Sequence, residues 1–181
     1  GPREAVPVMA IAAILANASR VVAWWRDVDW RTTLAYSVTA MPAAALGART
    51  LLALPGTLVE LVLGAFFIAM IPIRRRMLAQ QWRLGPRGMM AVGAGVGFLT
   101  GIVASTGPLN TPFFLMAGLA KGAFLGTEAM ASIGMYVAKA ATFHGFGALP
   151  MEAVVQGLIV GASMMAGTFI GKRFVLQLDA R

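Results

Sequence analysis

Hydrophobic residues in this chain gather into long runs, and charged residues fall mainly in the short segments between them. A helix needs about 20 apolar residues to cross the hydrocarbon core of a bilayer. Runs near this length predict five or six crossings and one half-length apolar segment. The predicted spans are 5–25, 33–54, 57–73, 88–105, 124–144 and 150–176, and the half-helix is 108–119. The pattern predicts an all-α, polytopic transmembrane helical bundle that forms one domain over residues 1–181.

The composition agrees with a membrane location. The chain is 59% hydrophobic and 12% charged, whereas soluble domains carry about 25% charged residues. So little charge would not cover a water-facing surface. The net charge of +8 is typical of basic loops that face anionic lipid. Because no zinc-ligand spacing and no RNA- or DNA-binding motif accompanies it, no nucleic-acid partner is expected.

The motifs of catalysis and of metal binding are missing from the sequence. It has no nucleophile elbow, no phosphate-binding loop and no His-Glu-x-x-His pattern. One histidine and no cysteine leave almost no ligands for a transition metal. We therefore expect no catalytic residues, no metal site, no cofactor and no enzymatic activity.

Basic residues are concentrated between the third and fourth predicted spans. The loop 74–87 contains Arg74, Arg75, Arg76, Arg83 and Arg87. By the positive-inside rule this loop lies in the cytoplasm. Alternation along the chain then places the basic segment 26–31 on the same side and the uncharged turn 145–149 on the outer side. The predicted location is the plasma (inner) membrane of a bacterium.

Glycines recur in the run 88–105, at Gly93, Gly95, Gly97 and Gly101. The Gly97-x-x-x-Gly101 spacing lets two helices approach closely. We interpret these glycines as helix-packing positions rather than as substrate contacts.

The helical pattern breaks at Ser105-Thr106-Gly107-Pro108-Leu109-Asn110-Thr111-Pro112. Two prolines and a glycine in eight residues interrupt a regular helix, although apolar sequence flanks both sides. Irregular backbone at membrane depth occurs only inside protein or beside a water-filled cavity. We interpret 88–119 as a broken or re-entrant helix with an anion site at its break, where a helix N-terminus and neutral donors meet. The site residues would be Ser105, Thr106, Gly107, Pro108, Asn110 and Thr111. The alternative is a packing kink.

Two basic residues, Arg20 and Lys139, lie inside predicted spans, five residues before the end of each run. Ionisable residues at membrane depth are costly and often functional, but long side chains near the end of a span also snorkel to the headgroups. For Lys139 both interpretations stay open, with attraction of the anion as the functional one. For Arg20 snorkelling is favoured. Asn17 and Tyr136, about one turn deeper, would line a pathway or bond a neighbouring helix.

Three further titratable residues have simple structural interpretations. Glu128 and Glu152 fall in the first turns of predicted helices, where an acid compensates the helix dipole. His144 lies at the end of a span and is interpreted as an interfacial residue rather than a proton relay.

The chain contains a weak internal repeat. A shift of 119 residues aligns 8–25 with 127–144, and a shift of 124 aligns 40–52 with 164–176. The two copies are predicted to be inverted, because the loop inside the first is basic and the loop inside the second is uncharged. Only the second copy follows a broken helix. We therefore expect a fragment that lacks one broken helix at the start and one helix at the end.

Short motifs in both halves carry a resemblance to a known family. They are Val28-Asp29-Trp30-Arg31, Leu46-Gly47-Ala48-Arg49, Leu54-Pro55, Gly97-Phe98-Leu99-Thr100-Gly101, Thr106-Gly107-Pro108, Pro112 and Gly118-Leu119. Through them the chain resembles the sulfite exporter TauE/SafE family of membrane permeases. Members usually carry a glycine cluster before the proline, which is reduced here to Thr106-Gly107-Pro108. The resemblance implies a permease for sulfite or for small organosulfur and carboxylate anions.

Two functions from different classes are consistent with these features. The first is transport of a small anion, such as sulfite, an organosulfonate or a carboxylate, by alternating access around the break at 105–112. The second is a non-transporting membrane scaffold or accessory subunit. Transport predicts polar residues around a hydrated cavity at the break, whereas a scaffold predicts a dry, packed break. The expected partners are the lipid bilayer and the anion, and a homo-oligomer is left open.

Overall fold

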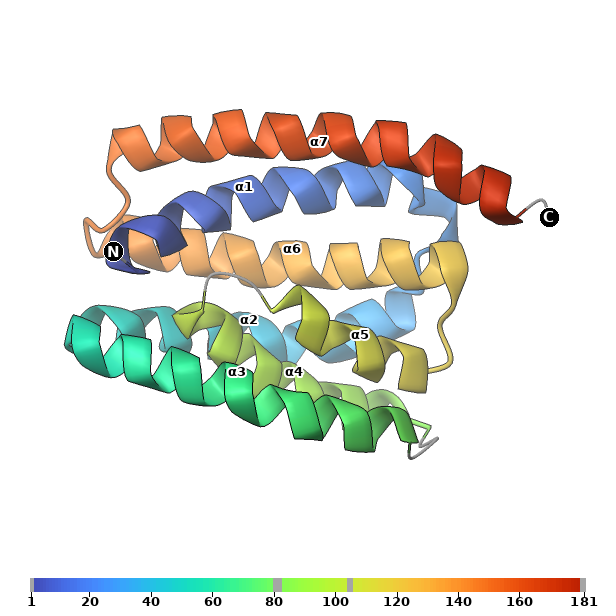
Figure 1. Ribbon diagram of the computed structural model, residues 1–181, viewed down its shortest axis with the longest axis horizontal. Helices are drawn as coiled ribbons and strands as arrows, with labels where there is room; N and C mark the ends of the chain where they lie inside the picture. Colours follow the sequence, from blue (N-terminus) through green and yellow to red (C-terminus); the bar gives the residue numbers. More distant parts are fainter. Residues whose placement is uncertain (1, 80–82, 104–105, 180–181) are drawn as a thin grey trace.

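The computed structural model describes residues 2–79, 83–103 and 106–179, and every regular element in these ranges is helical (Figure 1). The elements are α1 (Pro2–Ala23), the short 3-10 helix η1 (Trp25–Asp27), α2 (Trp30–Ala53), α3 (Gly56–Ala79), α4 (Pro86–Ile102), α5 (Gly107–Met116), α6 (Lys121–Gly145) and α7 (Met151–Asp179). The all-α fold predicted from the apolar runs is therefore confirmed.

Several helix boundaries differ from the predicted ones by a few residues. α3 continues past residue 73 to Ala79, so part of the predicted basic loop is helical. α4 ends at Ile102 rather than at 105, and α6 begins at Lys121 rather than at 124. Hydropathy does not mark the end of α3 or the start of α6, because arginine and lysine have good helix propensity and extend a helix beyond its apolar part.

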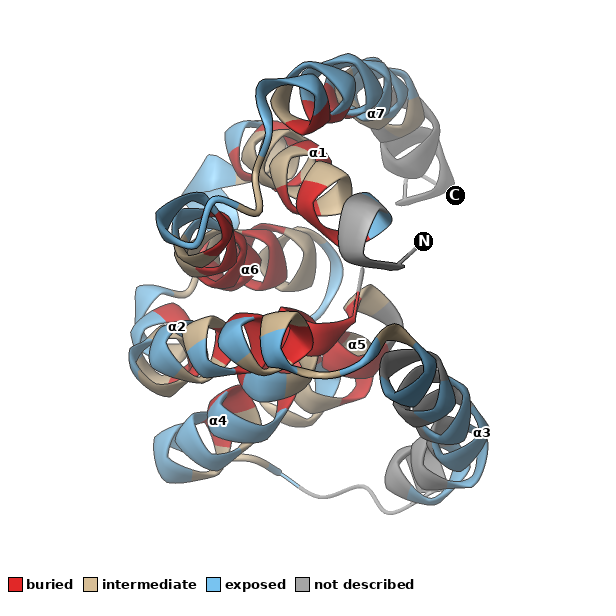
Figure 2. Ribbon diagram, turned by 90° about the vertical axis from the view of Figure 1, so that its left-hand side faces the viewer, coloured by how far each residue is buried: buried red, intermediate tan, exposed pale blue. Residues whose placement is uncertain are grey.

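The helices pack side by side in the order α7, α1, α6, α2 and α4 (Figure 1). α5 lies beside α6 and α4, and α3 contacts α5 and α1. Figure 2 shows buried positions on the facing sides of α1, α6 and α2, whereas α3 and α7 present mostly exposed ones among their described side chains. α6 is therefore the central helix, and a site inside the bundle has to use its side chains.

The interior of the bundle contains polar side chains beside its apolar core, and many large apolar side chains are exposed on the exterior. The buried polar residues include Asn17, Thr100, Asn110, Glu128 and Lys139. Large exposed hydrophobic side chains occur on the two outer helices, and they include Leu61 and Ile68 on α3 and Ile159 and Ile170 on α7. An exterior of this kind is unfavourable in water. Lipid tails would cover it, because they are as apolar as the side chains themselves.

Among the described residues, two helical segments are long and apolar enough to cross a membrane by these criteria alone. They are Ala5–Ala23 in α1 and Met151–Gly171 in α7. Length and hydropathy by themselves do not separate such helices from the core helices of a soluble protein. The crossings assigned above to the other spans stay predictions.

The order and direction of four helices are compatible with an inverted repeat. α1 runs parallel to α7 and α2 runs parallel to α6, whereas α1 and α6 are antiparallel (Figure 1). If α1 is exchanged with α6 and α2 with α7, the packing order α7, α1, α6, α2 becomes α2, α6, α1, α7, which is the same order counted from the other side. Two inverted copies would give this relation. Order and direction do not establish that the two pairs superpose, so the inverted repeat stays a prediction.

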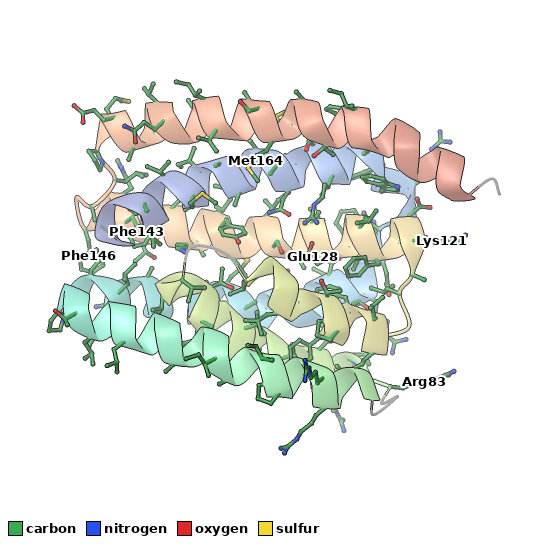
Figure 3. The ribbon with its side chains drawn as sticks, in the orientation of Figure 1. Arg83, Lys121, Glu128, Phe143, Phe146 and Met164 are labelled. Carbon is green, nitrogen blue, oxygen red and sulfur yellow. The ribbon has the colours of Figure 1, made fainter. Side chains whose placement is uncertain are left out.

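Basic segments gather at one end of the bundle. Figure 3 shows Arg83 and Lys121 at this end and Phe146 at the opposite end. The loop after α1 also belongs to the basic end, since Asp27 lies against Gly122 at the start of α6. The two basic segments predicted to share one side of the membrane therefore share one end of the fold.

The interface between α2 and α4 is built from small residues. Gly97 lies against the backbone of Ala40, and Gly101 lies against the backbone of Ala44 and Ala48. A Cβ atom added at Gly97 would be 2.4 Å from the carbonyl oxygen of Ala40, which no real Cβ contact allows. The packing interpretation of Gly97-x-x-x-Gly101 is confirmed.

Gly97→Ala should destabilise the protein by about 1–2 kcal/mol, because overpacking forces the backbones of α2 and α4 apart. Gly95 is the matched control, since a Cβ added there meets nothing within 4 Å. Gly95→Ala should be neutral or slightly stabilising, because alanine has the higher helix propensity. Thermal unfolding of both variants in detergent measures the difference. Equal melting temperatures would contradict close packing at Gly97.

Candidate functional site

The break after α4 makes α5 a re-entrant helix. α4 ends at Ile102, α5 begins at Gly107, and the backbone N–H of Leu84 donates to the carbonyl oxygen of Met116 at 2.8 Å. This bond joins the end of α5 to the residue just before α4, so α5 returns to the end from which α4 started. Its 10 residues span about 15 Å, half of a hydrocarbon core of about 30 Å. The predicted broken or re-entrant element is present, in its re-entrant form.

A cavity of about 290 Å³ lies next to the start of α5. Its walls come from α1, α5, α6 and α7, and Gly107 is the contribution of α5. Figure 3 labels two of the residues that line the cavity, Glu128 on α6 and Met164 on α7. The polar side chains that line the cavity are Asn17, Arg20, Glu128, Ser132, Tyr136 and Thr168. The break therefore borders a cavity whose wall is largely apolar and also carries these polar side chains.

An ion pair between Arg20 and Glu128 dominates the cavity wall. Nη2 of Arg20 donates to Oε2 of Glu128 and also to Oδ1 of Asn17. The Arg20 side chain is 29% exposed and the Glu128 side chain only 4%. The guanidinium group thus faces the cavity, while the carboxylate lies behind it. The preference for a snorkelling Arg20 was wrong, because a carboxylate inside the bundle holds the side chain there.

A hydrogen-bond network connects Glu128 to α5 and α2. Oε1 of Glu128 accepts from Ser132 Oγ at 2.9 Å and from Asn110 Nδ2 at 3.1 Å. Asn110 Oδ1 in turn accepts from the hydroxyl of Tyr36 at 2.8 Å. Among the described side chains, no buried polar atom lacks a hydrogen-bond partner. Asn110 therefore fixes the carboxylate from behind rather than lining the cavity itself.

Lys139 lies outside the cavity wall and holds the end of α4. Its ammonium group donates to the carbonyl oxygens of Thr100 and Val103, both at 2.6 Å. These are among the last carbonyls of the helix, where a cation also compensates the negative end of the dipole. The side chain is fully buried, so snorkelling, left open above, is wrong for Lys139. Its hydrogen bonds hold the end of α4 beside the break, and attraction of the anion stays a prediction.

The remaining predicted site residues do not all line the cavity. Thr106 is buried, and its hydroxyl lies 2.5 Å from that of Thr100. Thr111 Oγ1 donates to the carbonyl oxygen of Gly107 at 3.3 Å, within its own helix. Ser105 and the side chain of Pro108 lie outside what the structure describes. Of the ten predicted residues, Asn17, Arg20, Gly107 and Tyr136 line the cavity.

The first turn of α5 contributes its dipole rather than a row of free amides. The N–H groups of Leu109 and Asn110 already donate to the carbonyl oxygen of Thr106, at 2.9 and 3.1 Å. Pro108 has no N–H group. The expectation that several backbone amides of this helix point at a cargo therefore needs correction. The positive end of the α5 dipole still adjoins the cavity at Gly107.

Glu128, Ser132 and Thr168 line the cavity and were not among the predicted site residues. Glu128 is the charged one of the three. It was assigned to the first turn of a helix, but α6 begins at Lys121 and places Glu128 about two turns inside. One signal was available. Glu128, Ser132, Tyr136 and Lys139 follow each other at intervals of four, four and three residues, which puts all of them on one face of a helix. The dipole interpretation of Glu152 is confirmed, since this residue lies in the first turn of α7.

A bundle with an apolar exterior, an ion pair in the wall of a cavity and a re-entrant helix that begins at that cavity is typical of membrane transport proteins. The chain matches the family model described as Sulfite exporter TauE/SafE over residues 1–181. It therefore belongs to this family of membrane transporters, as the motifs on both sides of the break indicated. No curated protein and no solved structure gives a significant match.

Proposed function

We propose that the protein is a permease that moves a small anion, such as sulfite, an organosulfonate or a carboxylate, by alternating access around the cavity beside Gly107. The observation that carries this proposal is the partly exposed Arg20 side chain in the wall of a cavity at the tip of a re-entrant helix. A planar guanidinium group binds two oxygens of an oxyanion at once. The α5 dipole adds positive potential at the same place.

The size and lining of the cavity favour a small cargo. Small-molecule sites usually measure about 300–1,000 Å³, and this cavity of about 290 Å³ lies at the lower limit. Asn17, Ser132, Tyr136 and Thr168 surround Arg20 with neutral polar groups. Such groups accept or donate hydrogen bonds without fixing the identity of the anion, so a class of related oxyanions fits better than one specific molecule.

The helix order supports alternating access. The cavity wall comes from α1 and α7 on one side and from α5 and α6 on the other. α1 packs mainly on α7 and on α6, while α2 and α4 form a second tightly packed pair. A small rotation of the α1–α7 pair against the rest would therefore open the cavity toward one membrane face and then the other, as rocking transporters do.

Flux in proteoliposomes tests the proposal. Vesicles that contain the full-length protein should exchange radiolabelled sulfite, and unlabelled sulfonates and carboxylates should compete with it in an order that defines the cargo class. Inorganic cations and neutral sugars should not compete. A folded protein that exchanges none of these anions would instead favour a scaffold or accessory subunit.

We also propose that the protein lies in the inner membrane of a bacterium with its basic end in the cytoplasm. The chain contains no cysteine, so single-cysteine variants report orientation without background. Arg83→Cys at the basic end should react with a membrane-impermeant thiol reagent only after the cells are permeabilised. Met151→Cys, whose parent side chain is 75% exposed near the opposite end, should react in intact cells. Labelling of Arg83→Cys in intact cells would reverse the topology.

A further inference from the structure

Glu128 is a buried carboxylate whose two oxygens have different partners. Oε2 accepts only from Arg20 among the bonds described, and Oε1 accepts from Ser132 and Asn110. If the Arg20 side chain moves away from Glu128, Oε1 keeps both of its hydrogen-bond donors and Oε2 loses the donor described for it. A change in the contact with Arg20 therefore alters the hydrogen bonding of Oε2 and leaves that of Oε1 unchanged.

An anion in the cavity and Glu128 compete for the same guanidinium group. Two negative charges that share one cation in a low-dielectric site repel each other strongly. An uncompensated buried carboxylate is itself costly, and such a group takes up a proton rather than stay charged. Binding of an anion to Arg20 thus favours the neutral form of Glu128.

We infer that Glu128 carries one proton together with each anion, a mechanism that rests on the proposed transport function. The incoming anion takes the hydrogen bonds of Arg20, and Oε2 of Glu128 receives a proton from water on the side to which the cavity is open. When the anion leaves on the other side, the proton leaves with it and the Arg20–Glu128 pair forms again. Anion and proton therefore move in the same direction.

The charged and titratable groups around Glu128 favour it as the residue that carries the proton. Arg20 faces it from α1, Tyr36 reaches it from α2 through Asn110, and Tyr136 lines the same cavity from its own helix. Among the described side chains, α5 and α7 contribute the uncharged Asn110 near the carboxyl group and Thr168 in the cavity wall. Within the described part of the chain, no second acid contacts Arg20. Lys139 lies about 16 Å farther along α6, given the rise of the helix, and its ammonium group is held by α4.

Glu128→Gln in proteoliposomes tests the inference. The amide copies the size of the protonated carboxyl group and removes the competitor for Arg20. Sulfite should therefore bind at least about tenfold more tightly to the variant. In the wild type, each unit of imposed pH gradient should change sulfite accumulation by about tenfold through the extra proton. In Glu128→Gln only the response due to the protonation of sulfite itself should remain. Glu152→Gln, an exposed acid outside the cavity, should behave as the wild type.

The outcomes separate this inference from the function on which it rests. Equal responses of the wild type and Glu128→Gln to the pH gradient, with both exchanging sulfite, would overturn proton coupling and leave the permease standing. Absence of sulfite exchange in the wild type would overturn both. If Glu128→Gln does not fold, calorimetry of sulfite binding to the wild type in two buffers of different ionisation enthalpy decides the matter. Uptake of about one proton beyond that of sulfite itself supports the coupling, and no extra proton refutes it.

Discussion

Arg20→Met should weaken sulfite binding by at least about 100-fold and reduce sulfite flux to the level of empty vesicles. The variant removes the charged donor that faces the cavity. Each hydrogen bond to a charged group contributes about 1.5–3 kcal/mol, so loss of a two-bond contact costs about 3 kcal/mol or more. Binding of radiolabelled sulfite to the purified protein in detergent measures the effect.

Stability has to be separated from binding in this experiment. Arg20→Met leaves Glu128 buried without its cation, and removing one partner of a buried pair costs about 3–5 kcal/mol. The double variant Arg20→Met/Glu128→Gln removes both charges, so it should regain most of the stability and still fail to bind sulfite. Thr111→Val is a control, because this hydroxyl bonds its own helix. A folded double variant with wild-type affinity would show that the anion does not use Arg20.

Lys139→Met should lower the free energy of unfolding by about 2–4 kcal/mol. The methionine leaves the buried carbonyl oxygens of Thr100 and Val103 without the donor that now lies 2.6 Å from each. Each unpaired buried group costs about 1–3 kcal/mol. Relief from burying an ammonium group offsets part of this cost. Thermal unfolding in detergent measures the change.

The control and the salt dependence decide how Lys139 acts. Lys121→Met removes the same charge from an exposed position, and it should shift the free energy of unfolding by less than about 0.5 kcal/mol. The loss in Lys139→Met should persist at high salt, because a direct bond to a buried carbonyl is screened little. If Lys139→Met keeps its stability and weakens sulfite binding only at low salt, Lys139 acts by long-range attraction instead.

Sequence patterns were sufficient for the helices and for the break. Apolar runs placed the α-helices α1 to α7, since burial in lipid or in the bundle requires such runs. Gly107 and Pro108 marked the interruption, because proline and glycine disfavour a continuous helix. Pro112 was wrongly included in the break, since it lies inside α5. The direction of α5 was not readable in the same way. The hydrogen bond that joins the end of α5 to the start of α4 links backbone atoms of Leu84 and Met116, and backbone bonds between distant residues leave no mark on side-chain identity.

The functional side chains were only partly predictable for a related reason. Arg20 and Glu128 lie 108 positions apart, and a single sequence offers no means of pairing them. Their separate interpretations, as a snorkelling arginine and a dipole-compensating acid, each suited the local sequence. Lys139 was identified as unusual, but its partners are two carbonyl groups of α4. Any residue supplies such a carbonyl, so the sequence could not name them.

The transport of sulfite by the full-length wild type and by Arg20→Met/Glu128→Gln, each reconstituted in proteoliposomes, tests the central claim most directly. Equal amounts of folded protein are compared with protein-free vesicles. The wild type should exchange radiolabelled sulfite well above the protein-free level, and the double variant should not exceed that level. Equal exchange by the two proteins would contradict a pathway through the cavity at Arg20, and exchange by neither would contradict sulfite transport itself.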